Sequence, residues 1–314
     1  MNQRTRQLGT CAATALAALA LFVVFAHPQA PASPADACMA RHSGATPQQR
    51  IAFCIAAENS GSTRIVGILN NLGTAYASEG DYADSLAAFD RALALAHHKS
   101  QLYDNRAAVY RDQHRYASAI ADVSRAISLA PEVVGYHDDR GFDYLASGQL
   151  AGAVSDFSAA LRLAPADSNA YSGRGVAYQQ MRHYRRAIAD FSQAIQFDRG
   201  DADYYNDRCW TRDIANLDLP LALADCNQAV TLSPRTPDYL DSRGFTYLKL
   251  AQWSNAIADY SAALALNPKL PSSLYGRGLA RRASGDASGA AADIAAAQAL
   301  DPNIATEFAG YGVP

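Results

Sequence analysis

The chain repeats itself every 34 residues, and this period constrains the fold more than any other feature of the sequence. Residues 237–270 show the unit clearly: two apolar runs at helical spacing are separated by the sequence QWS at 252–254 and closed by Pro268. Proline disfavours helix at the residue before it, so it ends the second run. Each unit is therefore predicted to be a pair of helices joined by a short turn.

Small and bulky residues mark the same positions in seven successive units. The small set lies in the first helix of each unit: Gly73, Ala107, Gly141, Gly175, Cys209, Gly244 and Gly278. A larger residue recurs in the second helix: Phe89, Val123, Phe157, Phe191, Cys226, Tyr260 and Ile294. Because a residue with little or no side chain lets another helix come close, these positions predict where helices touch.

This order of small, aromatic and proline positions resembles the tetratricopeptide repeat family, whose unit is a 34-residue helix–turn–helix. The resemblance implies an all-α, right-handed α-solenoid with seven repeats over residues 66–304. It also implies that the first helices line a concave face. Residues 38–64 align with one further, degenerate hairpin that carries two cysteines, and residues 305–314 are expected to cap the last hairpin.

Residues 1–26 have the features of an export signal. Two arginines precede an apolar run from Leu8 to Ala26, and the end of this run fits a small-residue cleavage site. We interpret it as a signal peptide. The alternative is an uncleaved membrane anchor, because a run of about 19 residues is just long enough to span a bilayer. Either interpretation places the repeats in the periplasm or at the periplasmic face of the inner membrane, with residues 27–37 as an extended linker.

The sequence has a net charge of −3 and no basic stripe, which argues against a nucleic-acid partner. The sequence contains no Gly-rich phosphate loop, no H-E-x-x-H sequence and no nucleophile elbow. The histidines are scattered and the carboxylates are spread over repeat positions. We therefore expect no catalytic residue and no cofactor.

Four cysteines beyond the signal occupy equivalent positions in two hairpins. The two helices of a hairpin face each other at those positions, so an oxidising compartment predicts the disulfides Cys38–Cys54 and Cys209–Cys226. Each disulfide closes a loop of about 16 residues. In the chain-entropy model, such a loop stabilises the folded chain by roughly 3 kcal/mol. The competing interpretation is a metal site at Cys38, His42 and Cys54. That site lacks a fourth ligand, so we expect no metal.

Arginine precedes the small residue in six repeats, and aspartate precedes the larger second-helix residue in the same six. The first repeat lacks both. Because arginine and aspartate are present in the same six repeats and both absent from the first, we expect ion pairs between helices, within a repeat or across to the next. The pairs are Arg106–Asp122, Arg140–Asp156, Arg174–Asp190, Arg208–Asp225, Arg243–Asp259 and Arg277–Asp293. The aspartates neutralise the row of arginines, which argues against an anionic ligand there.

Two rows of first-helix residues are expected to line the concave face, one of acids and amides and one apolar. The candidate peptide-binding residues are Asp138, Phe142, Val176, Asn206, Trp210, Asp241 and Phe245. Such a face suits an extended peptide with hydrophobic and basic side chains, and tryptophan is enriched among binding hot spots. The alternative is that the apolar row only packs neighbouring first helices.

The sequence therefore favours a non-enzymatic scaffold of the cell envelope that binds a protein or an extended peptide segment. The membrane is expected to be a partner only through the N-terminal segment, if that segment is uncleaved. The alternative function is a structural or assembly component of an envelope complex that self-associates or acts through its terminal hairpins.

Overall fold

The computed structural model describes residues 33–40 and 44–313, so the signal or anchor expected at 1–26 and His42 lie outside the described residues. Within those residues the chain forms seventeen α-helices and no strand. Among them, none combines the length and apolar character needed to cross a membrane. The helices are α1 (Pro34–Met39), α2 (Pro47–Asn59), α3 (Ile65–Ser78), α4 (Tyr82–Leu95), α5 (Ser100–Asp112), α6 (Tyr116–Leu129), α7 (Val134–Ala146), α8 (Leu150–Leu163), α9 (Ser168–Gln180), α10 (Tyr184–Phe197), α11 (Ala202–Ile214), α12 (Leu219–Leu232), α13 (Pro237–Lys249), α14 (Trp253–Leu266), α15 (Pro271–Ala283), α16 (Ala287–Leu300) and α17 (Ile304–Gly310).

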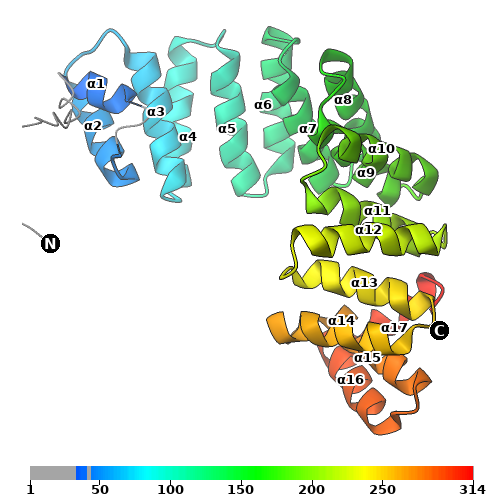
Figure 1. Ribbon diagram of the computed structural model, residues 1–314. Helices are drawn as coiled ribbons and strands as arrows, with labels where there is room; N and C mark the ends of the chain where they lie inside the picture. Colours follow the sequence, from blue (N-terminus) through cyan, green and yellow to red (C-terminus); the bar gives the residue numbers. More distant parts are fainter. Residues whose placement is uncertain (1–32, 41–43, 314) are drawn as a thin grey trace, which may run out of the picture.

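Consecutive helices pack as pairs, and each pair packs against the next. Figure 1 shows the pairs following a curved path, in which the row from α1 to α6 bends near α7–α10 into a second arm. Odd-numbered helices of several neighbouring repeats, such as α11 and α13 or α13 and α15, also contact each other. The first helices therefore line the inner side of the curve. The predicted all-α solenoid of seven repeats with an additional N-terminal hairpin is confirmed.

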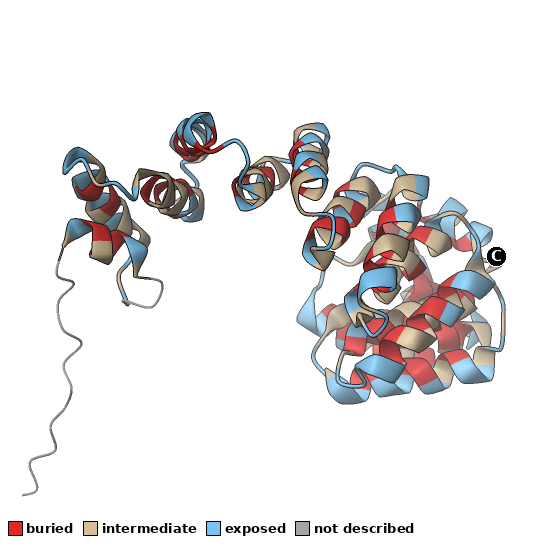
Figure 2. Cartoon of the chain, turned by 90° about the horizontal axis from the view of Figure 1, so that it is seen from above, coloured by how far each residue is buried: buried red, intermediate tan, exposed pale blue. Residues whose placement is uncertain are grey.

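The core is a series of contacts between the small and the larger residues. A Cβ added to Gly141 would lie 2.8 Å from the ring of Phe157 in the same repeat. A Cβ added to Gly173 of the next repeat would lie 2.4 Å from the same ring. The ring of Phe157 is fully buried between the two repeats. Figure 2 shows the wider pattern, with buried residues on the sides of helices that face other helices.

The turn inside each repeat contains a residue with a left-handed backbone. Three repeats place glycine there, and the others place a residue that has a side chain. These residues are Gly80, His114, Gly148, Arg182, Asn216, Ala251 and Gly285. The repeat from 202 is one residue longer, and its turn contains a second such residue, Asp218, with φ of 49°. Asparagine and aspartate tolerate this conformation better than most residues, so the turn accommodates the extra residue.

The N-terminal hairpin begins earlier than the sequence suggested. Helix α1 starts at Pro34, and the Ser33 hydroxyl oxygen accepts a hydrogen bond from the Asp36 amide at 3.1 Å. Ala35 and Ala37 are buried. Residues 34–37 are therefore helical and do not belong to an extended linker, because their alanines pack into the hairpin. The rest of the expected linker, residues 27–32, lies outside the described residues.

The C-terminal segment takes a path that the sequence did not indicate. Helix α17 contacts α15 and α16, as a cap of the last hairpin would. Its residue Phe308 also reaches Phe245 of α13, with the ring centroids 5.5 Å apart. Tyr311, just beyond α17, reaches Trp210 of α11 at 5.2 Å. Figure 1 places α17 beside α13 and α15. The segment therefore covers part of the concave face.

Candidate binding groove

The arginine and aspartate side chains meet as two-point ion pairs between the two helices of each repeat. In the pair on α13 and α14, Arg243 Nε lies 2.6 Å from Asp259 Oδ2 and Nη2 lies 2.8 Å from Oδ1. The same geometry joins Arg106–Asp122, Arg140–Asp156, Arg174–Asp190, Arg208–Asp225 and Arg277–Asp293. All six aspartates are buried. These guanidinium groups are engaged inside the solenoid and do not form a free cationic row.

Each of these arginines also bonds to the preceding repeat. Its third nitrogen, Nη1, reaches a polar residue on the second helix of that repeat. The acceptors are Asp90 for Arg106, Ser124 for Arg140, Ser158 for Arg174, Ser192 for Arg208, Asn227 for Arg243 and Ser261 for Arg277. One guanidinium therefore ties three helices, both within a repeat and across to its neighbour. The sequence carries a signal for this bond, a polar residue directly after the larger second-helix residue, but it was not part of the predicted pairs.

Two repeats carry arginine where the others carry tyrosine, and the structure gives a reason. Arg281 Nη1 donates to Asp293 Oδ2 at 2.7 Å, and Arg212 bonds to Asp225 in the same way. Where tyrosine is present, its ring lies near the arginine of the pair, as at Tyr144, whose centroid is 5.9 Å from the guanidinium carbon. Either residue type therefore supports the ion pair of its own repeat.

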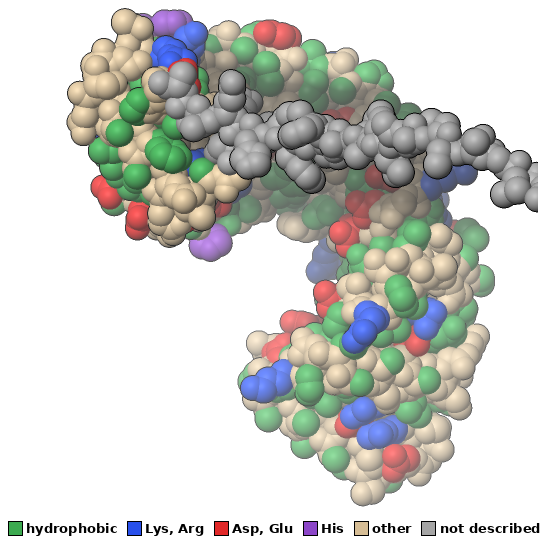
Figure 3. All heavy atoms as spheres, turned by 60° about the vertical axis from the view of Figure 1, so that its left-hand side comes forward, with side chains coloured by type: hydrophobic (Ala, Val, Ile, Leu, Met, Phe, Trp, Pro, Cys, Tyr) green, Lys and Arg blue, Asp and Glu red, His purple; other side chains and the backbone are tan. Residues whose placement is uncertain are grey.

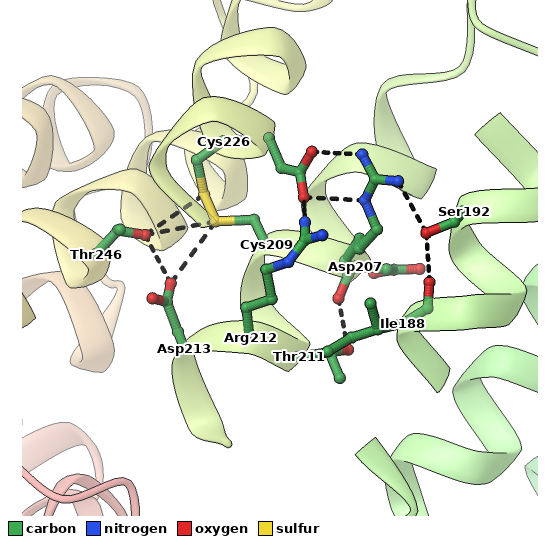
Figure 4. Close-up of polar contacts among 11 residues, drawn as sticks. Ile188, Ser192, Asp207, Cys209, Thr211, Arg212, Asp213, Cys226 and Thr246 are labelled. Carbon is green, nitrogen blue, oxygen red and sulfur yellow. Dashed lines mark hydrogen bonds and ion pairs between the residues drawn. A yellow bond between two sulfur atoms is a disulfide. The ribbon is translucent and has the colours of Figure 1, made fainter. Parts of the chain in front are cut away.

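Both cysteine pairs form disulfides, Cys38–Cys54 between α1 and α2 and Cys209–Cys226 between α11 and α12. In the second bridge, Cys209 stands at the small first-helix position and Cys226 at the larger second-helix position, where several other repeats have glycine and an aromatic residue. Figure 4 shows its polar surroundings. Asp213 Oδ2 lies 3.6 Å from Cys209 Sγ and accepts a hydrogen bond from Thr246 Oγ1 at 2.6 Å. Burial raises the pKa of Asp213 to about 7, against the effect of that hydrogen bond.

One group of side chains among the described residues has the spacing to hold a metal ion: Cys209, Asp213 and Cys226. In the disulfide form both sulfur atoms are bonded to each other, so the group offers one carboxylate. A structural zinc site needs four ligands. The alternative metal site at Cys38 and Cys54 meets the same objection, because those sulfur atoms are also joined.

Three aspartates of the first helices lie among other carboxylates: Asp104, Asp138 and Asp207. Burial raises the pKa of each to about 7, and neighbouring negative charges add to the effect. Those neighbours are Asp139 for Asp104, Asp167 and Asp139 for Asp138, and Asp203 and Asp201 for Asp207. Figure 3 shows acidic side chains gathered along the inner edge of the bend. The inner face therefore carries clustered carboxylates, with Arg111 paired to Asp139 and Asp143 among them.

The apolar row is open in its first half and covered in its second. Phe142 is 42% exposed, and Val176 is half-buried. Phe245, by contrast, is 1% exposed, and the half-buried ring of Trp210 packs on it at 5.1 Å. Phe245 therefore does not line an open groove as expected, because the C-terminal segment of the same chain lies on it.

A hollow of about 320 Å³ remains beside the covered half. Asn206, Trp210, Asp241 and Phe245 all line it, so the structure brings four of the seven candidate residues together. The buried carboxamide oxygen of Asn206 has no hydrogen-bond partner here, and the same holds for Asp138 Oδ1 farther along the inner face. Both are acceptors that a partner's N–H group would satisfy.

Sequence comparison identifies the family of the chain. Family models of the tetratricopeptide repeat match residues 64–132, 139–202 and 243–303. These matches span more than half of the sequence, and the chain belongs to the tetratricopeptide repeat family. The stretch between the last two matches is the cysteine-bearing repeat with the extra turn residue.

Solved structures share the fold at low sequence identity. A tetratricopeptide repeat protein from Parabacteroides merdae covers 79% of this chain and 99% of its own, with 17% identity and a TM-score of 0.64. The Cut9–Hcn1 hetero-tetramer matches over 85% of this chain and 54% of the other, with 16% identity and a TM-score of 0.55. No curated protein matches the sequence significantly. These likenesses establish the fold.

Proposed function

We propose that the protein is a non-enzymatic scaffold that binds a segment with basic and apolar side chains on its concave face. The observation that carries the proposal is the crowding of Asp104, Asp138 and Asp207 with other carboxylates. The arginines of the six ion pairs are held by their own aspartates. Arg111 offsets part of the inner charge, because it pairs with Asp143 and Asp139, but the carboxylates still outnumber it. A partner's lysine or arginine would pair with these carboxylates and relieve their mutual repulsion.

The apolar half of the recognition comes from the open part of the same face. Phe142 is 42% exposed and stands one helical turn after Asp138. Val176 occupies the same repeat position on α9. A segment that runs along the first helices would therefore meet apolar and acidic side chains together. Asp138 and Asn206 would accept hydrogen bonds from its backbone or from its basic side chains.

We place this scaffold in the cell envelope. The N-terminal sequence has the pattern of an export signal, and the described chain contains two buried disulfides. Disulfides persist in oxidising compartments and are rare in the cytosol. The two observations are independent, and both support export.

The proposal is tested with the mature full-length chain and a labelled peptide of alternating leucine and lysine. We expect the variant Asp138→Asn/Asp207→Asn to bind this peptide at least tenfold more weakly than the parent. The control variant Asp84→Asn/Glu132→Gln changes the net charge equally at exposed positions outside the first helices, and should bind as the parent does. Equal binding by all three chains, or equal binding of a leucine–glutamate peptide, would reject the proposal.

Light scattering on the same samples addresses the alternative function. A scaffold that uses its groove is expected to keep one mass over a wide concentration range. A mass that rises with concentration, together with unchanged peptide binding in the Asp138→Asn/Asp207→Asn variant, would favour an assembly component instead.

A further inference from the structure

The segment 304–313 is seated on the concave face as a bound helix would be. Phe308 lies between two rings, 4.9 Å from that of Tyr275 and 5.5 Å from that of Phe245. Tyr311 lies against Trp210, and its backbone carbonyl accepts a hydrogen bond from Lys249 Nζ at 3.0 Å. Two aromatic residues three positions apart, one on α17 and one just beyond it, thus occupy an aromatic surface of α11, α13 and α15.

This segment fills the surface incompletely. Three hollows border it, of about 320, 400 and 360 Å³, and its own residues line each of them. These hollows open to solvent, so a ligand can reach the edges of the segment while it is in place. Within the segment only Ile304 and Phe308 are buried, and the other residues of 305–313 are half-buried or exposed. The contact is therefore a small one that a competing helix could replace.

The charge of the segment also fits the surface poorly. Glu307 lines the 320 Å³ hollow together with Asp238 and Asp241. These three carboxylates have the same sign of charge, so they repel each other, although solvent weakens the repulsion because Glu307 and Asp238 are exposed. A lysine or arginine at the position of Glu307 would instead complement both aspartates. The surface is therefore better matched to a helix of different charge than to the one it holds.

We propose that residues 304–313 are a displaceable latch on a docking surface for a partner helix. The surface consists of Trp210, Phe245 and Tyr275 with Asp238 and Asp241. The partner helix carries two aromatic residues three positions apart and a basic residue directly before the first. This inference rests on the proposed function of the concave face and adds its regulation. In the latched state only the part around Phe142 and Val176 is open, and release of the latch extends the groove.

The test uses the mature full-length chain and two labelled peptides. One has the sequence of residues 303–313, and the other has the same sequence with Glu307→Lys. If the latch is closed about 99% of the time, the affinity for an external ligand falls about 100-fold, because the apparent affinity is proportional to the fraction of the protein in the open state. We expect the variant Phe308→Ala/Tyr311→Ala to bind both peptides at least tenfold more tightly than the parent, and the lysine peptide more tightly than the native one.

The control variant Leu95→Ala/Leu163→Ala changes two exposed residues of second helices and should bind as the parent does. If the unlatched variant keeps its helicity and thermal transition yet binds neither peptide better than the parent, the latch is rejected. These peptides carry the latch sequence, whereas the aspartate variants test the acidic face, so the two proposals can fail separately.

Should the double variant not fold, hydrogen exchange on the unchanged chain decides the question. Excess lysine peptide is expected to speed amide exchange in residues 308–313 at least tenfold, because it displaces the latch. The same peptide should slow exchange at the N–H groups of α13 that it covers. Exchange in residues 308–313 that is unaffected by a saturating concentration of peptide would show a fixed cap and overturn the proposal.

Discussion

At the scale of single residues, the fold depends on places where a ring leaves no room for a Cβ. The sequence revealed one such series, because Gly141, Gly175 and Gly244 recur at the repeat period. It did not reveal Gly173, which is small because the Phe157 ring of the preceding repeat reaches it. That contact crosses between repeats and appears only when the packing of neighbours is known.

We predict that Gly173→Ala destabilises the chain by about 1–3 kcal/mol, the usual range for overpacking a filled core. The added Cβ would lie 2.4 Å from Phe157, which is fully buried. The matched control is Gly135→Ala on α7, where a Cβ meets nothing within 4 Å. That change is expected to raise the free energy of unfolding by as much as about 1 kcal/mol, because alanine has a higher helix propensity than glycine. Urea unfolding measures both, and equal stability of Gly173→Ala and the parent would contradict the packing.

At the scale of helices, the arginine–aspartate pairs connect the elements of the solenoid. The partners followed from the sequence because arginine and aspartate are absent together from the first repeat. The start of α1 and the path of α17 did not follow from the repeat. The aromatic contacts of the last segment join residues about three repeats apart, such as Tyr311 and Trp210, and no period encodes them.

We predict that reversing either charge of the Arg243–Asp259 pair costs about 3–5 kcal/mol, because it leaves a charge without its partner in a largely buried site. Asp259 is 7% exposed. The exchange Arg243→Asp/Asp259→Arg should recover at least half of the loss, but not all, since the bond to Asn227 is not rebuilt. Thermal unfolding of the three variants provides the comparison. No recovery in the exchanged chain would show that the pairing does not hold α13 to α14.

At the scale of the whole molecule, the solenoid combines an internal network of neutralised pairs with an acidic inner face. The sequence predicted both rows of the concave face. It also placed Trp210 and Phe245 in one apolar row, but could not show that the chain itself covers them. The candidate residues lie on the first helices, and their role in binding stays a prediction. The structure adds which of them are open to solvent and which the C-terminal segment covers.

The acidic face makes stability depend on pH. The pKa values of Asp138 and Asp207 rise from 3.8 to about 7 on folding. Between about pH 4 and 7 the folded state therefore binds more protons than the unfolded state, so the free energy of unfolding falls as pH rises. We predict a higher Tm at pH 5 than at pH 8, and a smaller difference in the variant Asp138→Asn/Asp207→Asn. Differential scanning calorimetry would contradict this if Tm rose with pH or if the variant behaved as the parent does.

The most direct test of the binding scaffold is side-chain footprinting by hydroxyl radicals, with the leucine–lysine peptide bound to the full-length chain. Binding on the concave face predicts protection of Phe142 and Val176 on the first helices. It predicts no protection of Leu95, Leu163 and Leu266 on the second helices, which are exposed to a similar degree as Phe142. Protection of the second-helix leucines without protection of Phe142 and Val176 would contradict the assignment of the groove.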